Sequence, residues 1–394
     1  MHSHIIRNGL HRLRSWTTCL LVILWFTGPG CKQAYTPPVL QTNPNLLVIE
    51  GVINGGAGTT TTFTLSRTQK IGDSLGAYTP EPQAQVSISG SAGETYPLKE
   101  QGKGSYISAP LSLNHGEKYQ VKITTRNGSK YQSDAVPVTT APPIDSLSFK
   151  QDDSSGRVTV SINTHDPAGA SHYYRWYFSE TWEYHTALTS ELALDSTGHI
   201  FYAIDSISQV FLVYYCWRGD NSSDILLGNS TALGQDRISQ APIATIPRAS
   251  QKIQMRYSML ASQYVLTQAA YDYWLILQKN TQNLGSLFDP QPSQLKGNYQ
   301  CLTNPNEPVI GYLSVGTIQQ KRFFISNSQV SNWDPGLSDC PTRVTDQGPT
   351  YDIYTYSDTA WGPYYFAGTT LILSRRVCLD CRVQGGTTTK PSFW

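Results

Sequence analysis

The sequence is poor in charged residues and in long apolar runs, and each absence excludes a class of protein. Charged residues make up 14% of the 394 residues, with 29 Lys and Arg against 28 Asp and Glu and a net charge of +1. Because this balance leaves no basic patch and no acidic tail, we expect no nucleic acid among the partners. The longest apolar run, residues 16–26, is far short of the roughly 20 residues that a spanning helix requires. We therefore predict no transmembrane domain.

Several signatures of catalysis are also missing. None of the histidines after residue 145 lies in an HExxH or HxH pattern, the arrangements that hold catalytic zinc. The segment Asp220–Asp224 begins like a calcium loop, but Ile225 stands where that loop requires glycine, so a turn is the favoured interpretation. We predict that the protein is not an enzyme and has no catalytic residue, metal site or cofactor.

The start of the chain has the order of a secretory signal. Three arginines precede the apolar run of residues 16–26, and the small, helix-breaking residues 27–30 (TGPG) lead directly to Cys31. A cysteine after a small residue predicts lipoprotein processing, in which the signal peptide of residues 1–30 is removed and Cys31 becomes the lipidation site. The alternative is ordinary cleavage that leaves Cys31 as a plain cysteine.

Lipidation would decide where the protein resides. Residues 31–44 contain three prolines, which oppose a helix, so we expect them to form a lipidated tether. More than one acyl chain gives stable attachment to a bilayer. We therefore predict a lipid-anchored protein of the outer membrane, either at the cell surface or on the periplasmic leaflet.

Five of the seven cysteines follow the lipidation site, and disulfides are their default in an oxidising compartment. The disulfide candidates are Cys301, Cys340, Cys378 and Cys381. These four allow three pairings that sequence does not distinguish, and Cys216 is left over. The spacing of Cys378 and Cys381 also fits a redox pair or half of a zinc site, but export and the absence of a helix after them favour structural bridges.

The pattern of the remaining chain predicts a mainly β fold. Residues 45–140 contain several short runs that alternate apolar and polar side chains, which predicts an immunoglobulin-like or fibronectin-like β-sandwich. An Asn-Gly pair at Asn127 predicts a hairpin with a type I′ turn. The prolines of residues 141–145 (APPID) mark a domain boundary. Residues 145–394 then form a larger β-rich domain with a disulfide-stapled C-terminal tail.

One packed helix is expected within the larger domain. Thr267 is a suitable N-cap, residues 268–283 have helical spacing, and Gly285 can end the helix. Its apolar side chains, which include Tyr273 and Trp274, are expected to pack against a sheet face.

An aromatic segment, residues 172–184 (HYYRWYFSETWEY), supplies the candidate ligand surface. Its tentative members are Trp176, Trp182 and Tyr184. Aromatic rings at these positions would stack on a sugar or another flat ligand. The carboxylates among residues 179–183 allow the alternative of glycoside hydrolysis by paired acids, although carboxylates on aromatic strands are usually solvent-facing.

Several short motifs then identify a resemblance. They are Tyr215-Cys216-Trp217, residues 285–293 (GSLFDPQPS), Gly297-Asn298, Asn304-Pro305, Gly311-Tyr312, Lys321-Arg322, residues 378–381 (CLDC), Gly385-Gly386 and residues 390–394 (KPSFW). With these motifs the chain resembles an uncharacterised family of Bacteroidota-type outer-membrane lipoproteins (domain of unknown function 4249). The resemblance implies a lipoprotein often encoded next to a TonB-dependent receptor, and it implies no known activity. Members at the outer face often carry acidic residues after the lipid cysteine, whereas here the first acidic residue is Glu50.

Taken together, these features favour an accessory protein of the cell envelope. The leading hypothesis is a binding or interaction subunit of a TonB-dependent uptake or assembly complex. Its expected partners are the membrane, through the lipid anchor, and a TonB-dependent receptor or another outer-membrane protein. One alternative is a secreted glycan-acting hydrolase. The other is a structural surface component without a small ligand.

Overall fold

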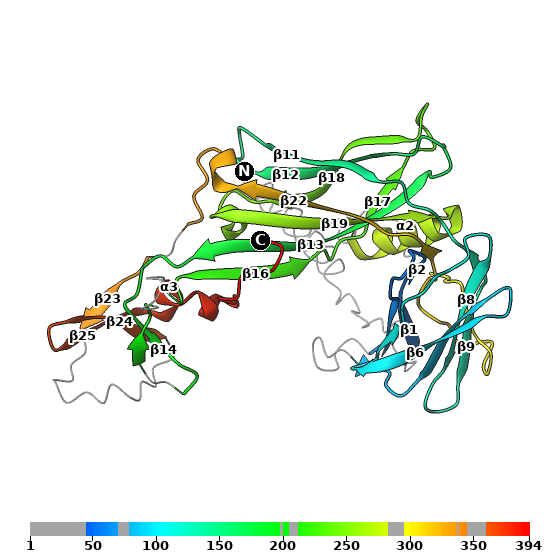
Figure 1. Ribbon diagram of the computed structural model, residues 1–394, viewed down its shortest axis with the longest axis horizontal. Helices are drawn as coiled ribbons and strands as arrows, with labels where there is room; N and C mark the ends of the chain where they lie inside the picture. Colours follow the sequence, from blue (N-terminus) through cyan, green and yellow to red (C-terminus); the bar gives the residue numbers. More distant parts are fainter. Residues whose placement is uncertain are drawn as a thin grey trace, which may run out of the picture. The chain divides into compact units, whose positions relative to one another are not determined.

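The computed structural model describes residues 45–69, 79–197, 200–204, 212–282, 295–336, 339–344 and 360–394. The predicted signal peptide and tether, with Cys31, lie outside these ranges. All the described helices and strands belong to one compact unit formed by residues 46–68 and 76–394. The fold is mainly β, as predicted (Figure 1). No helix in the described part of the chain is long and apolar enough to cross a bilayer.

The first sheet has ten strands in the order β1-β3-β7-β6-β5-β8-β9-β20, with β4 beside β3 and β10 beside β8. Its strands are β1 (Leu47–Gly51), β3 (Thr62–Arg67), β4 (Thr79–Pro80), β5 (Gln85–Gly90), β6 (Thr95–Gly102), β7 (Ser105–Ser108), β8 (Lys118–Thr124), β9 (Lys130–Ser133), β10 (Val136–Pro137) and β20 (Tyr299–Cys301). In β8, for example, the alternate residues Tyr119, Val121 and Ile123 are buried and form part of one apolar face. One core therefore unites strands that lie far apart in the sequence.

The hairpin predicted at Asn127 joins β8 to β9, but its turn differs from the prediction. The Asn127 side chain accepts hydrogen bonds from the Thr125 hydroxyl (2.6 Å) and the Ser129 backbone N–H (3.1 Å). Gly128 has φ +86°, whereas Asn127 is not among the residues with positive φ. A type I′ turn requires positive φ at both central residues, so the predicted hairpin is confirmed and the predicted turn type is wrong.

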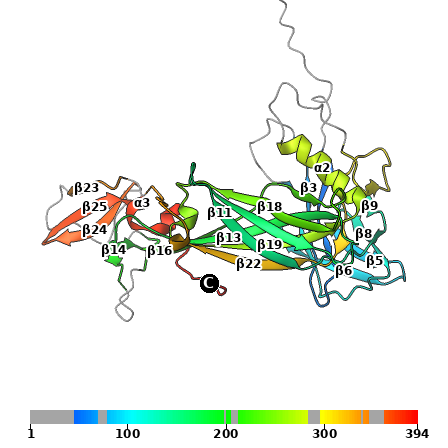
Figure 2. The same cartoon turned by 90° about the horizontal axis from the view of Figure 1, so that it is seen from above.

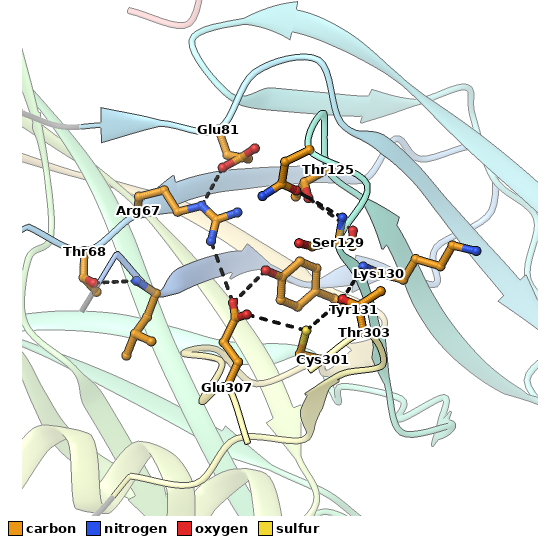
Figure 3. A network of polar contacts seen from close by, with 12 residues as sticks. Arg67, Thr68, Glu81, Thr125, Ser129, Lys130, Tyr131, Cys301, Thr303 and Glu307 are labelled. Carbon is orange, nitrogen blue, oxygen red and sulfur yellow. Dashed lines mark hydrogen bonds and ion pairs between the residues drawn. The ribbon is translucent and has the colours of Figure 1, made fainter. Parts of the chain in front are cut away.

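The last strand of the first sheet comes from far downstream, and a polar network holds it there (Figure 3). Arg67 donates to Glu81 (Nε–Oε2, 2.5 Å) and lies 3.9 Å from Glu307. Glu307 also accepts from the Tyr131 hydroxyl at 2.7 Å and from the Cys301 thiol at 3.7 Å. Residues 299–307 are thereby fixed to a sheet otherwise built from residues 47–137.

A three-stranded and a five-stranded sheet follow and pack face to face (Figure 2). We call this pair of sheets the second sandwich, because it follows the first sheet in the chain. The first has the order β11-β12-β18, and the second β16-β13-β19-β22 with β17 beside β13. The strands are β11 (Ile144–Gln151), β12 (Val158–His165), β13 (Tyr173–His185), β16 (Tyr215–Asn221), β17 (Leu226–Asn229), β18 (Arg237–Ile246), β19 (Arg256–Leu266) and β22 (Gln319–Ser326). Every even-numbered residue of β13 from Tyr174 to Tyr184 is buried in the core between the sheets. Its odd-numbered side chains therefore face away from that core.

The remaining elements are short. Two pair in parallel, β2 (Ile53–Asn54) and β21 (Val315–Gly316). One hairpin is formed by β14 (Leu192–Leu194) and β15 (Ile200–Tyr202). The C-terminal part of the chain forms a sheet of β23 (Thr342–Val344), β25 (Thr370–Arg375) and β24 (Trp361–Ala367), followed by α3 (Arg376–Leu379) and the 3-10 helix η4 (Cys381–Gln384). Two further 3-10 helices are η2 (Gln251–Ile253) and η3 (Asn327–Gln329).

The predicted long helix is confirmed as α2 (Gln268–Gln282). Thr267 caps it, because its hydroxyl accepts from the Ala270 backbone N–H at 3.2 Å. The predicted terminator, Gly285, lies outside the described residues. The four-residue α3 was not predicted.

The structure corrects the cysteine assignment. Cys216 is bonded to Cys381 and Cys340 to Cys378, whereas Cys301 is free and buried. The prediction was therefore right for Cys340, Cys378 and Cys381 and wrong for Cys301 and Cys216. Because each cysteine of residues 378–381 bonds to a distant partner, the two do not form a redox pair with each other.

Strand placement explains why Cys216 rather than Cys301 is paired. Cys301 lies in β20 at the edge of the first sheet. Cys216 lies in β16, which exchanges two backbone hydrogen bonds with the C-terminal segment through Trp217 and Thr387 (2.8 and 2.9 Å). This pairing brings the Cα atoms of Cys216 and Cys381 to 5.7 Å, a separation that a disulfide spans.

Candidate ligand-binding site

A cavity of about 480 Å³ opens where the first sheet, the second sandwich and α2 meet. Its walls come from β1 and the residues that follow it, from residues 60–62, from β13 and β19, from α2, and from residues 310–312. The charged side chains among its described lining residues are Arg175 and Glu50. The volume lies within the range of small-molecule sites, roughly 300–1,000 Å³.

Strand register places Arg175 in this wall. In β13 it lies directly opposite Tyr264 of β19 and Leu227 of β17. As an odd-numbered residue of β13, it lies on the face turned away from the sandwich core. Helix α2 contacts β13, β17 and β19, and it contributes Tyr273, Trp274 and Leu277 to the cavity. The helix therefore covers the sheet at Arg175 and closes one side of the cavity.

Arg175 is a shielded cation that has no anionic partner in the described part of the chain. Its Nε atom is buried and has no hydrogen-bond partner, and no ion pair of Arg175 occurs among the described residues. Burial lowers the pKa of Arg175, and the nearby Tyr264 and Glu50 offset only part of this effect. The guanidinium remains charged in water near neutral pH because its reference pKa is so high.

The ring of Trp274 supports this guanidinium. The Arg175 Cζ atom lies 3.6 Å from the ring centroid, which is within cation–π distance. Tyr273 packs edge-on against the same indole at 5.5 Å and against Tyr312 at 5.1 Å. The aromatic rings therefore form a continuous wall behind the cation.

The tyrosines that line the cavity have neutral hydroxyl groups. Burial raises the pKa of Tyr273 to about 12, while the Gly311 backbone and Arg175 oppose the shift. Burial likewise raises the pKa of Tyr264 and of Tyr312. Each hydroxyl can thus donate a hydrogen bond to a bound group.

Two glycines let the 310–312 wall approach β1. Gly311 has φ +143°, and a Cβ atom there would lie 2.4 Å from the Ile49 carbonyl oxygen. A Cβ atom at Gly297 would lie 1.9 Å from the Gly311 carbonyl oxygen. Asn298 then binds both backbone groups of Leu313, at 2.7 and 3.1 Å. The Gly297-Asn298 and Gly311-Tyr312 motifs therefore place Tyr312 in the cavity wall.

The predicted ligand surface is wrong. Trp176, Trp182 and Tyr184 are 2%, 5% and 0% exposed and belong to the core of the second sandwich. They occupy even-numbered positions of β13, so the strand period turns all three inward. Of the predicted carboxylates, Glu180 is buried too and binds the Tyr257 hydroxyl and Lys252.

Sequence reasoning missed Arg175, although a signal existed. A single arginine interrupts the aromatic run of residues 172–184 at an odd-numbered position, opposite in phase to the predicted aromatics. Tyr273 and Trp274 were predicted only as packing residues of the helix. The structure brings them to Arg175, a neighbour about one hundred positions away in the sequence.

Comparison with known proteins assigns the chain to a family. A family model described as a domain of unknown function (DUF4249) matches residues 32–322. The chain belongs to the DUF4249 family. The matched range contains the Arg175 cavity, whereas the motifs beyond residue 322, including CLDC and KPSFW, lie outside it. No curated protein matches the sequence.

Two solved structures show weak likeness to this DUF4249 chain. A Salmonella alpha-2-macroglobulin mutant is 11% identical, with a TM-score of 0.18, over 78% of this chain and 16% of that one. The Yersinia pseudotuberculosis adhesin InvE is 10% identical, with a TM-score of 0.15, over 56% of this chain and 57% of the adhesin. This chain therefore spans less than two thirds of either protein, and TM-scores this low carry no argument about function.

Proposed function

We propose that this DUF4249 protein is a lipid-anchored, non-enzymatic binding subunit of the outer membrane, accessory to a TonB-dependent uptake or assembly complex. The observation that carries the binding role is the cavity with the unpaired Arg175 at its aromatic wall. A concave site with a few convergent polar groups is the usual form of a ligand site. A purely structural surface component would not need one.

Two features support the exported location. The sequence begins with the order of a secretory signal ahead of Cys31. The two disulfides, Cys216–Cys381 and Cys340–Cys378, are typical of proteins that fold outside the reducing cytoplasm. The family description names no activity.

The lining favours binding over glycoside hydrolysis. Hydrolysis of a glycosidic bond uses two carboxyl groups on either side of the bond, whereas the described lining contributes one carboxylate, Glu50. A GxSxG pattern, Gly72–Gly76, has the spacing of a serine nucleophile motif. This pattern lies outside the described residues and contributes nothing to the proposal.

Affinity purification from membranes tests the proposed partnership. The protein, tagged at its C-terminus, is purified from detergent-solubilised outer membranes, and a Cys31→Ser variant serves as the matched control. We expect a TonB-dependent receptor to co-purify in near-stoichiometric amount with the wild type and to be lost with the unacylated variant. Purification of the wild type without a receptor, while other outer-membrane complexes stay intact, contradicts the accessory role.

A further inference from the structure

We propose that the cavity binds a small monocarboxylate with an apolar body, and that Arg175 holds the carboxylate. This inference rests on the proposed binding function and names the ligand class. Its starting point is a cation whose Nε atom is buried and unpaired. A buried charge normally has a partner of opposite sign, because an uncompensated one is strongly unfavourable. The described residues supply no such partner, and we assign this role to an anion from outside the chain.

The contact with Trp274 does not use a hydrogen-bond acceptor. Trp274 contacts the cation at 3.6 Å from the ring centroid, and a cation–π contact of this kind is made with the aromatic ring. The N–H groups lie in the guanidinium plane in a fork that matches the two oxygens of a carboxylate. Trp274 therefore orients Arg175 without occupying its hydrogen-bond donors.

The charge of the lining favours a monoanion. Arg175 and Glu50 are the charged residues in the described wall, so the wall offers one cation and no second cation for a dianion. A phosphate monoester, with close to two negative charges, would meet one cation and one repelling carboxylate. A monocarboxylate needs only the single cation, and a zwitterionic acid would use Glu50 as well.

The walls define the rest of the ligand. Trp274, Tyr264 and Tyr312 supply aromatic surface, and Leu277 and Ile318 supply aliphatic surface. Rings of this kind stack on planar apolar groups in offset or edge-on arrangements. The volume of about 480 Å³ accommodates a body of about one ring and a short chain. The ligand class is thus an aryl- or alkyl-substituted carboxylic acid.

Calorimetric titration of the acylated full-length protein in detergent tests this inference without any mutation. Hydrocinnamate is the probe, hydrocinnamamide is its uncharged isostere, and phenyl phosphate is the dianionic comparison. We expect the acid to bind at least roughly tenfold more tightly than the amide, because only the acid forms charge-assisted hydrogen bonds. We expect phenyl phosphate to bind more weakly than the acid. Equal affinity for acid and amide, tighter binding of phenyl phosphate, or no binding of the acid overturns the inference.

Paired variants assign the effect to Arg175. Arg175→Gln should abolish the preference for acid over amide. Arg256→Gln is the matched control, since Arg256 also stacks on an aromatic ring, that of Phe324 at 4.2 Å, but is absent from the cavity lining. If the preference survives in Arg175→Gln, the assignment is wrong. If a receptor co-purifies but hydrocinnamate does not bind, only the proposed ligand class is wrong. If hydrocinnamate binds but no receptor co-purifies, only the proposed accessory role is wrong.

Discussion

Two arginines of this protein lie in shielded surroundings; one of them pairs with an acidic side chain, whereas the other pairs with none in the described part of the chain. Arg67 in the first sheet is bonded to Glu81 and lies near Glu307 (Figure 3). Burial alone would lower the pKa of Arg67, but hydrogen bonds to Glu81 and Tyr131 outweigh burial and raise it. Arg175 has no such partner among the residues that the structure describes, and burial lowers its pKa. The same side chain thus serves as a structural clamp in one region and as an available cation in the other.

The largest expected effect concerns the paired arginine. Replacing Arg67 with Met leaves Glu81 and Glu307 without their cation in a largely buried site. Breaking a buried pair on one side typically costs about 3–5 kcal/mol, so we expect a loss of this size in the free energy of unfolding, measured by urea denaturation. A loss below about 1 kcal/mol would show that the first-sheet network is not a clamp.

A glycine substitution tests how the cavity wall is built. Gly311→Ala places a Cβ atom 2.4 Å from the Ile49 carbonyl oxygen, whereas Gly93, with φ +100°, has open space around its Cβ position. Both changes impose backbone strain of about 1–3 kcal/mol, but only Gly311→Ala should add the clash. We expect Gly311→Ala to lower the free energy of unfolding more than Gly93→Ala and to weaken hydrocinnamate binding. If both variants lose the same free energy of unfolding and both still bind hydrocinnamate, Gly311 does not shape the cavity wall.

Alkaline pH tests the buried tyrosine of the first-sheet network. Burial, helped by Glu307, raises the pKa of Tyr131 from 10.0 to about 12. Because the folded state favours the neutral phenol, this stabilisation is complete below pH 10 and is lost as the pH rises through 12. Tyr131→Phe should therefore flatten the decline of unfolding free energy over this window by about 2 kcal/mol. An unchanged slope in the variant would contradict the assignment.

The smallest expected effect concerns the unpaired arginine. Arg175→Met removes a shielded cation that has no anionic partner among the described residues. Replacing an uncompensated buried charge with an apolar side chain is neutral or stabilising, so we expect the free energy of unfolding to fall by no more than about 1 kcal/mol. Arg256→Met provides the reference for loss of a stacked arginine. A loss comparable to that of Arg67→Met would place Arg175 in the scaffold.

The sequence predicted the architecture better than the site, for physical reasons. Period-two alternation and an N-cap threonine are local signals, and they predicted the β fold, the hairpin at Asn127 and helix α2. Which side of an aromatic strand is buried depends on the sheet that packs against it, and this placed Trp176 and Trp182 in the core instead of on a surface.

The sequence also could not predict contacts between residues that lie far apart in the chain. The Cys216–Cys381 bond depends on β16 lying beside the C-terminal segment, 165 positions away. The cavity likewise brings Glu50, Arg175 and Trp274 together only through sheet topology. No local sequence pattern indicates that these three residues lie close together, although an arginine within an aromatic run is unusual.

Ligand-induced stabilisation tests the contrast between the two arginines most directly. The free energy of unfolding of wild type and Arg175→Met is measured by urea denaturation with and without saturating hydrocinnamate. At one hundred times the dissociation constant, a ligand of the native state adds about 2.7 kcal/mol. The account predicts a gain of this order for the wild type and almost none for Arg175→Met. Equal gains in both proteins, or no gain in the wild type, would contradict it.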